Sequence, residues 1–345
     1  MSPLTYSLPL FLVSLLSLSL PSVTDATSYQ TTGSIPTLSL ANTLVPVHIP
    51  RILLGTGGGN GGYNTTAWLT VNGPGYDTAQ TYCYNAVAPY CSPVSIFNSL
   101  IQTQTNPDSL FIISKIEPED FGTVDTLTGF GRPITRGILQ EMSLPSINML
   151  MFHQAGRHET DTNPHPNCFN ISGATNGQGT YAQCRIETFL ALRSLLSDNT
   201  TYSVGVSNWQ IRELQQVYNA TGIYPSALEI EVHPYWHEDD LINFCIANNI
   251  TVINYAPLAL GTQYGLLSDP AVVAVAQNHQ VTPAQAVLRW GLQKTQGIVI
   301  PRSANVTHMI ENMNIFDFEL TDTEMQSLSV LPQKKIFNVY CQPWC

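Results

Sequence analysis

The chain has 345 residues, of which 43% are apolar and 11% are charged, so it is long enough to bury a large core. Its formal net charge is −11 and its pI is near 5.0. This acidic balance argues against nucleic acid or an anionic membrane surface as a partner. Any anion that the protein binds must therefore be held by a local cluster of residues.

The N-terminus predicts a targeting segment. Residues 8–20 form an apolar stretch that is short for a membrane span, and Pro21 and small residues follow it. We interpret residues 1–27 as a secretory signal peptide, with an uncleaved signal anchor as the alternative. The expected location is the secretory pathway, in the ER lumen or outside the cell, with no membrane contact after cleavage. The remaining divisions that we expect are a flexible lead-in at 28–35, a barrel at 36–331 and a C-terminal tail at 332–345.

Cysteines and sequons agree with an oxidising compartment. Three local pairs would leave Cys245 as a buried free thiol, although spacing does not prove the pairing: Cys83–Cys91, Cys168–Cys184 and Cys341–Cys345. No group of His and Cys has zinc spacing, so no metal is expected. Six sequons, several of which chance would supply, begin at Asn64, Asn170, Asn199, Asn219, Asn249 and Asn305.

Short apolar runs alternate with helical patterns from residue 36 to about residue 305. The expected strands are 51–55, 75–79, 110–116, 147–153, 202–208, 227–233, 251–257 and 297–303. Apolar residues recur at helical spacing in 92–102, 185–196, 209–218, 239–249 and 282–294. This alternation predicts an α/β fold with a single (β/α)8 TIM barrel, whose bottom is closed by an N-terminal hairpin at 36–50.

Two local features complete this prediction. Ser92 stands before Pro93, so we expect Ser92 to cap the helix that follows. Residues 154–184 show no clear element, are rich in Asn, Gly, Thr and Pro, and follow the fourth strand. Such a loop would cover a substrate at the barrel mouth, or it is a glycosylated decoration.

Polar side chains close most of the expected strands, at the end of a barrel where active sites collect. In chain order they are Asp77, Tyr82, Lys115, His153, Ser207, Asn208, Glu229, His233, Tyr255, Arg302 and Ser303. Each of them alone has an ordinary explanation as a turn residue, a solvated charge or a packing residue. The set as a whole indicates a site.

The residue types in this set suggest proton donation. A tyrosine is a weak acid with an unperturbed pKa of about 10. An ammonium such as Lys115 lowers the pKa of a nearby phenol, and a carboxylate such as Asp77 keeps that ammonium charged. With His153 orienting a carbonyl, Tyr82 could protonate an oxygen while a nicotinamide cofactor supplies hydride to the carbon.

Seven segments in order resemble the aldo-keto reductases over residues 36–331: GYDTAQTY, IISKI, MLMFHQ, GVSNW, EIEVHPYW, NYAPLALG and VIPRSANVTHMIENMNIFDFEL. The resemblance implies a barrel that binds NADP(H) in preference to NAD(H) and reduces a small aldehyde or ketone, and we expect a monomer. It implies Tyr82 as the general acid, Lys115 and Asp77 as its tuners and His153 as the carbonyl-orienting group.

The same resemblance implies a set of cofactor contacts. Ser207 and Asn208 would bind the nicotinamide amide, and Tyr255 would stack on its ring. The full set is Thr56, Asp77, Ser207, Asn208, Glu229, Tyr255, Leu258, Arg302, Ser303, Asn305, His308, Glu311 and Asn312. Within this set, Arg302 to His308 fall where the family holds the adenosine 2′-phosphate, and Glu311 and Asn312 fall near the adenine.

The sequence departs from the family at several of these positions. Glu229 stands where the family usually has a glutamine, and a carboxylate can accept from an amide but cannot donate. Gly57 and Gln154 replace tryptophans, which predicts a wider and less apolar pocket. Arg302 replaces a lysine and can still grip a phosphate, whereas His308 replaces an arginine and weakens the case for NADP. A glycan on Asn305 would crowd the adenosine end, so we expect Asn305 to be unmodified.

Three other interpretations of the sequence compete with this one. Gly57, Gly59 and Gly62 fit a dinucleotide-binding fingerprint, but the stretch before the next strand is short for a crossover helix. A catalytically silent secreted barrel, used as a binding or interaction module, is the main rival. A glycosidase would use Glu229 or Glu231, for which no second carboxylate at another strand end is expected as a partner.

Overall fold

Eight parallel strands form the centre of the structure, which is a computed structural model that describes residues 34–57, 62–83, 92–118, 121, 132–156, 164–169 and 178–337. The strands pair in the order β3–β4–β5–β6–β9–β10–β11–β12. Their bounds are β3 Leu54–Gly55, β4 Gly75–Asp77, β5 Phe111–Ile116, β6 Ile147–Phe152, β9 Thr201–Ser207, β10 Ala227–Glu231, β11 Thr251–Tyr255 and β12 Ile298–Val299. A parallel bridge between Ile52 and Val299 joins the two edges, so the predicted barrel is confirmed.

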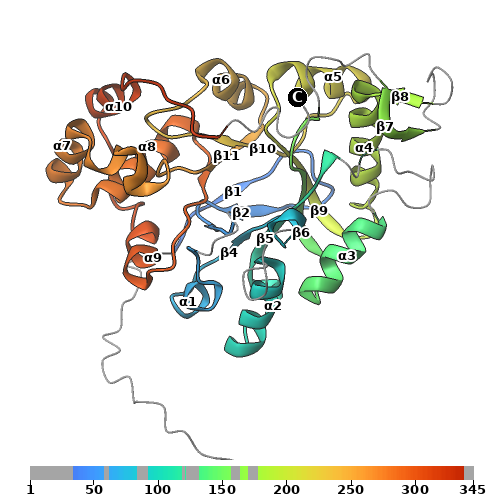
Figure 1. Cartoon of the computed structure of the whole chain (residues 1–345), viewed down its shortest axis with the longest axis horizontal. Coiled ribbons are helices and arrows are strands. Elements are labelled where there is room, and N and C mark those ends of the chain that lie inside the picture. Colours follow the sequence, from blue (N-terminus) through green and yellow to red (C-terminus); the bar gives the residue numbers. More distant parts are fainter. Residues whose placement is uncertain are drawn as a thin grey trace, which may run out of the picture. The chain divides into compact units, whose positions relative to one another are not determined.

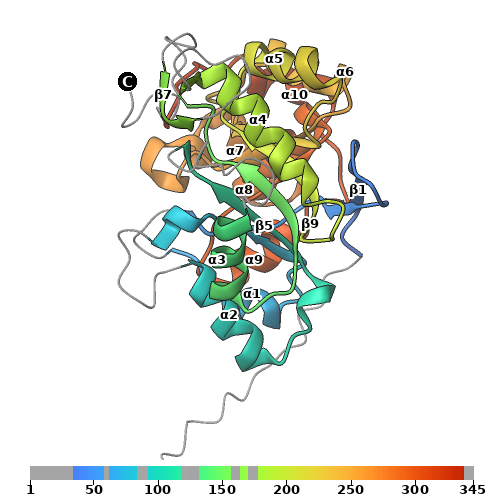
Figure 2. The same cartoon turned by 90° about the vertical axis from the view of Figure 1, so that its right-hand side faces the viewer.

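Alternate side chains of the strands fill the barrel interior. Phe111 and Ile113 of β5 pack there with Met149 of β6 and Ile253 of β11. Leu40, Val47 and Ile49 join the same cluster. They come from the hairpin of β1 (Thr37–Ser39) and β2 (His48–Pro50), which therefore closes the end where the strands begin, as predicted. In Figure 2, β1 and β7 (Pro164–Phe169) lie on opposite sides of the molecule.

Helices surround the barrel and bury a second apolar layer against the outer faces of the strands (Figure 1). They are α1 Thr65–Thr70, α2 Ser92–Thr103, α3 Arg132–Met142, α4 Tyr181–Ser194, α5 Ile211–Thr221, α6 Asp239–Ala247, α7 Pro270–His279, α8 Pro283–Thr295, α9 Val306–Met313 and α10 Asp322–Ser329. The five expected helices are α2, α4, α5, α6 and α8. The others were not predicted, and α1, α9 and α10 are too short to show a helical period.

Three local expectations were wrong. The short connection before β4 does hold a helix, the six-residue α1. The Ser92 hydroxyl does not cap α2, because it is buried in hydrogen bonds with the hydroxyls of Thr56 and Thr78. The segment 154–184 is not without elements, since β7 (Pro164–Phe169) and β8 (Gln178–Thr180) pair in it as an antiparallel sheet and α4 begins at Tyr181.

Several predictions concern residues outside the described part. They include the signal peptide, the sequon at Asn170 and the side chains of Cys83, Cys91, Cys168, Cys341 and Cys345. Cys245 is a buried free thiol, as predicted, and Cys184 is disulfide-bonded. Its pairing with Cys168 stays a prediction. Over the described residues, none of the helices has the length and apolar character that crossing a membrane requires.

Close backbone packing at Gly297 yields a prediction about barrel closure. A Cβ at this position would lie 2.0 Å from the carbonyl oxygen of Val252 in the neighbouring strand β11, beside the start of β12. We expect Gly297→Ala to reduce the free energy of unfolding by more than about 3 kcal/mol, because backbone atoms would have to separate. Urea unfolding followed by circular dichroism measures this change.

Gly137 offers a matched control for the same substitution. It lies in α3, and a Cβ there would meet nothing within 4 Å. Gly137→Ala should therefore raise the free energy of unfolding by about 0.5–1 kcal/mol through helix propensity. Equal effects of the two substitutions would contradict the packing at β12.

Candidate active site

A buried ammonium lies at the centre of the carboxyl ends of the strands. Lys115 on β5 is fully buried, and its Nζ donates to Asp77 Oδ1 on β4 at 2.5 Å. The same Nζ lies 3.3 Å from Glu229 Oε1 on β10 and donates to the backbone oxygen of Thr78 at 3.2 Å. Strand alternation turns all three charged side chains into the barrel. Lys115, Asp77 and Glu229 thus form a buried triad. Because a buried charge needs partners, the triad holds these three side chains in place at the rim of the barrel.

Tyr82 reaches the triad from the short 3-10 helix at Gln80–Cys83, which follows β4. The Lys115 Nζ lies 5.4 Å from the centroid of the Tyr82 ring. A Cβ on Gly57 would lie 3.0 Å from Tyr82 Cζ and 3.1 Å from its hydroxyl oxygen. The absence of a side chain at Gly57 thus leaves room for the phenol, and the structure brings Tyr82, Lys115 and Asp77 together.

His153 follows β6 and faces Tyr82 across the pocket. The two ring centroids are 5.6 Å apart with an interplanar angle of 77°. His153 Nδ1 lies 2.5 Å from Glu117 Oε1, and the Thr81 hydroxyl donates to the same oxygen at 2.6 Å. Glu117 was missed in the sequence, although it continues the alternation of Ile113 and Lys115 into the barrel. With Nδ1 engaged, Nε2 is the nitrogen of His153 that can meet a ligand.

The electrostatics of Tyr82 differ from the expectation that Lys115 makes this phenol acidic. Desolvation of the hydroxyl raises the pKa of Tyr82, and Lys115 lowers it. The carboxylates of Asp77, Glu229 and Glu117 add to the increase, so the pKa of Tyr82 lies above its ordinary value. Burial disfavours the charge on Lys115, but the carboxylates, Asp77 foremost, stabilise it and raise its pKa. Tyr82 is therefore held protonated, as a proton donor must be before it reacts.

A hydrogen-bonded network forms another wall of the site. Tyr255 on β11 donates from its hydroxyl to Asn208 Oδ1 at 2.9 Å. Asn208 Nδ2 donates to the backbone oxygen of His153 at 3.0 Å and contacts Ser207 Oγ at 3.1 Å. The Ser207 hydroxyl donates to the backbone oxygen of Glu229 at 3.0 Å. The network orients the Tyr255 ring and ties the ends of four strands together.

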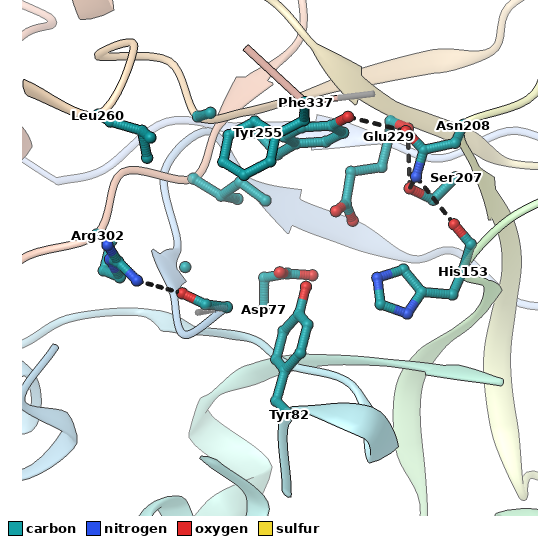
Figure 3. A pocket seen from close by; sticks show the side chains of 14 residues that line it. Asp77, Tyr82, His153, Ser207, Asn208, Glu229, Tyr255, Leu260, Arg302 and Phe337 are labelled. Carbon is teal, nitrogen blue, oxygen red and sulfur yellow. Dashed lines mark hydrogen bonds between the residues drawn. The ribbon is translucent and has the colours of Figure 1, made fainter. Parts of the chain in front are cut away.

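These side chains line one pocket with a volume of about 460 Å³ (Figure 3). Tyr82, Asp77, Glu229 and His153 approach its centre from different sides, and Arg302 donates to the backbone oxygen of Gly57 at 2.6 Å. Five further residues that were not predicted from the sequence also line the pocket: Gly55, Ala256, Leu260, Ile300 and Phe337. Phe337 lies in the C-terminal tail, beyond the strand ends from which the other site residues were predicted, so the sequence did not indicate it. It packs edge-on against Tyr255.

The remaining predicted cofactor residues lie outside the lining of this pocket. Thr56 is buried, and its hydroxyl donates to the backbone oxygen of Asp77 at 2.7 Å. The Asn305 side chain accepts from the backbone N–H groups of Thr307 and His308 and so caps α9. The others are Leu258, Ser303, His308, Glu311 and Asn312, whose proposed cofactor contacts stay predictions.

Two acidic residues on β10 have different environments. Glu231 is satisfied, since it accepts from His233 Nε2 at 3.0 Å and from the backbone N–H groups of Ile336 and Phe337 at 2.7 and 2.9 Å. Glu229 instead shares Lys115 with Asp77. The expectation that no second carboxylate lies near Glu229 was therefore wrong. No group of three or more His, Cys, Asp or Glu side chains in the described part could hold a metal ion.

Removing the buried cation should destabilise the fold in a pH-dependent way. Lys115→Met leaves Asp77 and Glu229 buried without a counter-ion, so we expect a loss of about 3–5 kcal/mol in the free energy of unfolding at pH 8. Without the cation the folded-state pKa values of both carboxyls rise, and stability then falls as the pH rises. The loss should therefore be smaller at pH 5, as measured by urea unfolding at both pH values.

Lys294 is the control for this substitution. Its Nζ lies 2.8 Å from Asp239 Oδ1, and the Asp239 side chain is 53% exposed. Lys294→Met should cost less than about 1 kcal/mol, with little dependence on pH. A cost for Lys115→Met no larger than this would show that the triad is not the stabilising contact described above.

The comparisons with known proteins agree with this geometry. A sequence model of the Aldo/keto reductase family matches residues 67–331. The chain is 30% identical to aldo-keto reductase family 1 member A1 of Mus musculus over 236 residues, which are 65% of this chain and 68% of that protein. An aldo-keto reductase enzyme from a deep-sea metagenome library matches with a TM-score of 0.71 and 24% identity, over 89% of this chain and 99% of that one.

A third match is the crystal structure of a mutant of Gox0644 in complex with NADPH. Its TM-score is 0.67 and its identity is 24%, over 88% of this chain and 95% of that one. The two structural matches support the same barrel fold, and the family model spans most of the described barrel. The chain therefore belongs to the aldo/keto reductase family and is an oxidoreductase.

Proposed function

We propose that the protein reduces an aldehyde or ketone to an alcohol with NAD(P)H as the reductant and Tyr82 as the proton donor. The observation that supports this most directly is the convergence of Tyr82, Asp77 and His153 on one pocket, with the buried Lys115 ammonium beside Asp77 and the Tyr82 ring. Outside this arrangement, none of these residue types would indicate a reductase. The family uses a nicotinamide cofactor, and that cofactor supplies hydride to the carbonyl carbon.

The residues of the pocket fit a nicotinamide group. The Tyr255 ring lines the pocket and is oriented by its bond to Asn208, so it offers a flat apolar face. Glu229 Oε2 is buried without a hydrogen-bond partner, which leaves a polar contact for a ligand amide. Ser207 and Asn208 line the same wall. We therefore assign the nicotinamide amide to the wall formed by Ser207, Asn208 and Glu229, and its ring to Tyr255.

The roles of the chain's own residues follow from the contacts in the pocket. His153 is held through Nδ1 by Glu117 and presents Nε2 to the carbonyl oxygen, which it orients. Tyr82 donates its hydroxyl proton to that oxygen as negative charge develops on it. The Lys115 ammonium then stabilises the Tyr82 phenolate, and Asp77 keeps the ammonium charged and in place.

NADPH is the cofactor that we favour over NADH. The basic side chain at the pocket edge is Arg302, which is exposed and uses NH1 for the backbone oxygen of Gly57. Its other N–H groups remain able to bind a phosphate in the forked manner of arginine. The Gox0644 mutant of the same fold was crystallised with NADPH, which agrees with this choice.

We also propose that the enzyme works in the secretory pathway, as a monomer. The basis for this location is the apolar leader in residues 8–20, together with the disulfide of Cys184. A catalytically silent barrel remains the alternative, because reduced nicotinamide cofactor is scarce outside cells. Titration with NADPH separates the two, since a silent barrel with this role would show no binding at millimolar cofactor.

The role of Tyr82 is tested by Tyr82→Phe. We expect the rate of reduction of a generic aldehyde to fall by about 10²- to 10⁴-fold, because the proton donor is lost. The dissociation constant of NADPH, measured by fluorescence titration, should stay unchanged. Tyr202→Phe is the control, because Tyr202 lies near the start of β9, at the opposite end of the barrel, and should keep full activity. Equal turnover by Tyr82→Phe and the wild type would rule out this acid.

The role of Arg302 is tested by Arg302→Gln. Losing charge-assisted contacts of about 1.5–3 kcal/mol should raise the dissociation constant of NADPH by about 10- to 100-fold and leave that of NADH nearly unchanged. Arg212→Gln removes an arginine from α5 that is about half exposed, and it should change neither constant. An equal loss of affinity for both cofactors in Arg302→Gln would contradict a 2′-phosphate contact.

A further inference from the structure

Glu229 is the one carboxylate of the β10 pair whose second oxygen is unmatched. Glu229 and Glu231 are both buried, at 2% and 3% exposure, and both face the barrel interior. Both oxygens of Glu231 accept hydrogen bonds, from the backbone of Ile336 and Phe337 and from His233. Glu229 Oε1 lies 3.3 Å from Lys115, and the Glu229 carboxyl is within hydrogen-bonding reach of the Asp77 carboxyl, a contact that requires a proton on one of the two. Oε2 of Glu229 accepts from no donor and belongs to a side chain that lines the pocket.

The charges around Glu229 do not balance if every carboxylate is ionised. Lys115 is the buried cation, and it lies closer to Asp77, at 2.5 Å, than to Glu229. The other titratable groups near this space are Tyr82, His153 and Glu117, of which Glu117 is held against His153 Nδ1 at 2.5 Å. Arg302 at the pocket edge is exposed and bonded to Gly57. One ammonium cannot neutralise two buried carboxylates, so a proton is favoured on one of them.

The distances identify which carboxyl takes this proton. Asp77 has the short contact with Lys115, which favours the ionised form of Asp77. Burial and the negative charge of Asp77 raise the pKa of Glu229 to about 8, against the opposing effect of Lys115. Glu229 is therefore the member of the pair that is neutral near pH 7.

The wall of the pocket also lacks a free donor beside Glu229. The Ser207 hydroxyl is committed to the Glu229 backbone oxygen, and the Tyr255 hydroxyl to Asn208. Asn208 Nδ2 donates to the backbone oxygen of His153. A carbonyl oxygen that enters this wall must find its donor elsewhere, and a protonated Glu229 would supply one from Oε2. Figure 3 shows the Glu229 carboxyl directed toward the centre of the pocket.

We propose that Glu229 is a neutral carboxylic acid in the working enzyme and donates a hydrogen bond from Oε2 to the carboxamide oxygen of the nicotinamide. This inference rests on the proposed function, since it assigns a contact within the same cofactor site. Glu229 then acts as a cofactor-binding residue whose donor exists only while it holds its proton. Cofactor affinity is thereby coupled to the pH, and the Lys115 ammonium remains with Asp77 and Tyr82.

The first test is the pH dependence of NADPH binding to the full chain. Fluorescence titration from pH 7 to pH 9.5 should show the dissociation constant rising by up to about tenfold per pH unit once the pH exceeds the pKa of Glu229. Glu229→Gln keeps a donor at every pH, so its dissociation constant should stay flat over this range. Glu231→Gln is the comparison on the same strand. It removes an acceptor for the backbone of Ile336 and Phe337 and so shifts the dissociation constant by a factor that does not depend on pH, and it should keep the slope of the wild type.

Calorimetry on the wild type gives a second readout that needs no variant. Above the pKa of Glu229, NADPH binding should take up close to one proton, measured in two buffers of different ionisation enthalpy. A flat dissociation constant in the wild type, an equal slope in Glu229→Gln, or no proton uptake would each overturn the proposal.

A third readout is independent of the cofactor. The folded-state pKa of Glu229 lies above its unfolded value, so the stability that its neutral form contributes is complete at low pH and is lost as the pH rises through the folded pKa. The free energy of unfolding of Glu229→Gln should therefore increase relative to the wild type between pH 5 and pH 9. If NADPH binds at no pH the proposed function fails, and this comparison still decides whether Glu229 is neutral. No change in the difference would mean that Glu229 is ionised.

Discussion

The contact between the Lys115 ammonium and two carboxylates is the interaction on which the rest of the site depends. It joins β4, β5 and β10 at the rim of the barrel and is fully enclosed. An isolated buried ammonium would be very unfavourable, so the position of Lys115 requires Asp77 beside it. That requirement places the phenol of Tyr82 near a fixed positive charge, which is what proton donation needs.

Three carboxylates lie close to the Tyr82 phenol. Glu117 holds His153, and Glu229 shares the cation with Asp77, so three acidic side chains surround one lysine and one tyrosine. In the protein without a ligand, burial and the charges of these carboxylates raise the pKa of Tyr82 above its ordinary value. A neutral Glu229 would remove one of these charges. The protonation state of Glu229 thus connects cofactor affinity with the acidity of the proton donor.

The tail also contributes to the pocket through an acidic residue of β10. Glu231 accepts from the backbone of Ile336 and Phe337, and this fixes Phe337 against Tyr255. Two carboxylates on one strand therefore have different roles: Glu231 attaches the tail, and Glu229 faces the pocket. The difference arises because successive inward positions of a strand lie at different heights in the barrel.

The sequence by itself determined the barrel, because eight apolar runs with polar residues at their ends carry the period and the punctuation of β/α units. It also determined the grouping of Tyr82, Asp77, Lys115 and His153, since the carboxyl ends of parallel strands must meet at one rim. Only the tertiary structure decided the pairing of Glu117 with His153, the approach of Asp77 to Glu229 and the place of Phe337. These contacts join residues that are distant in the chain, and their distances depend on barrel closure and side-chain packing, which local patterns do not encode.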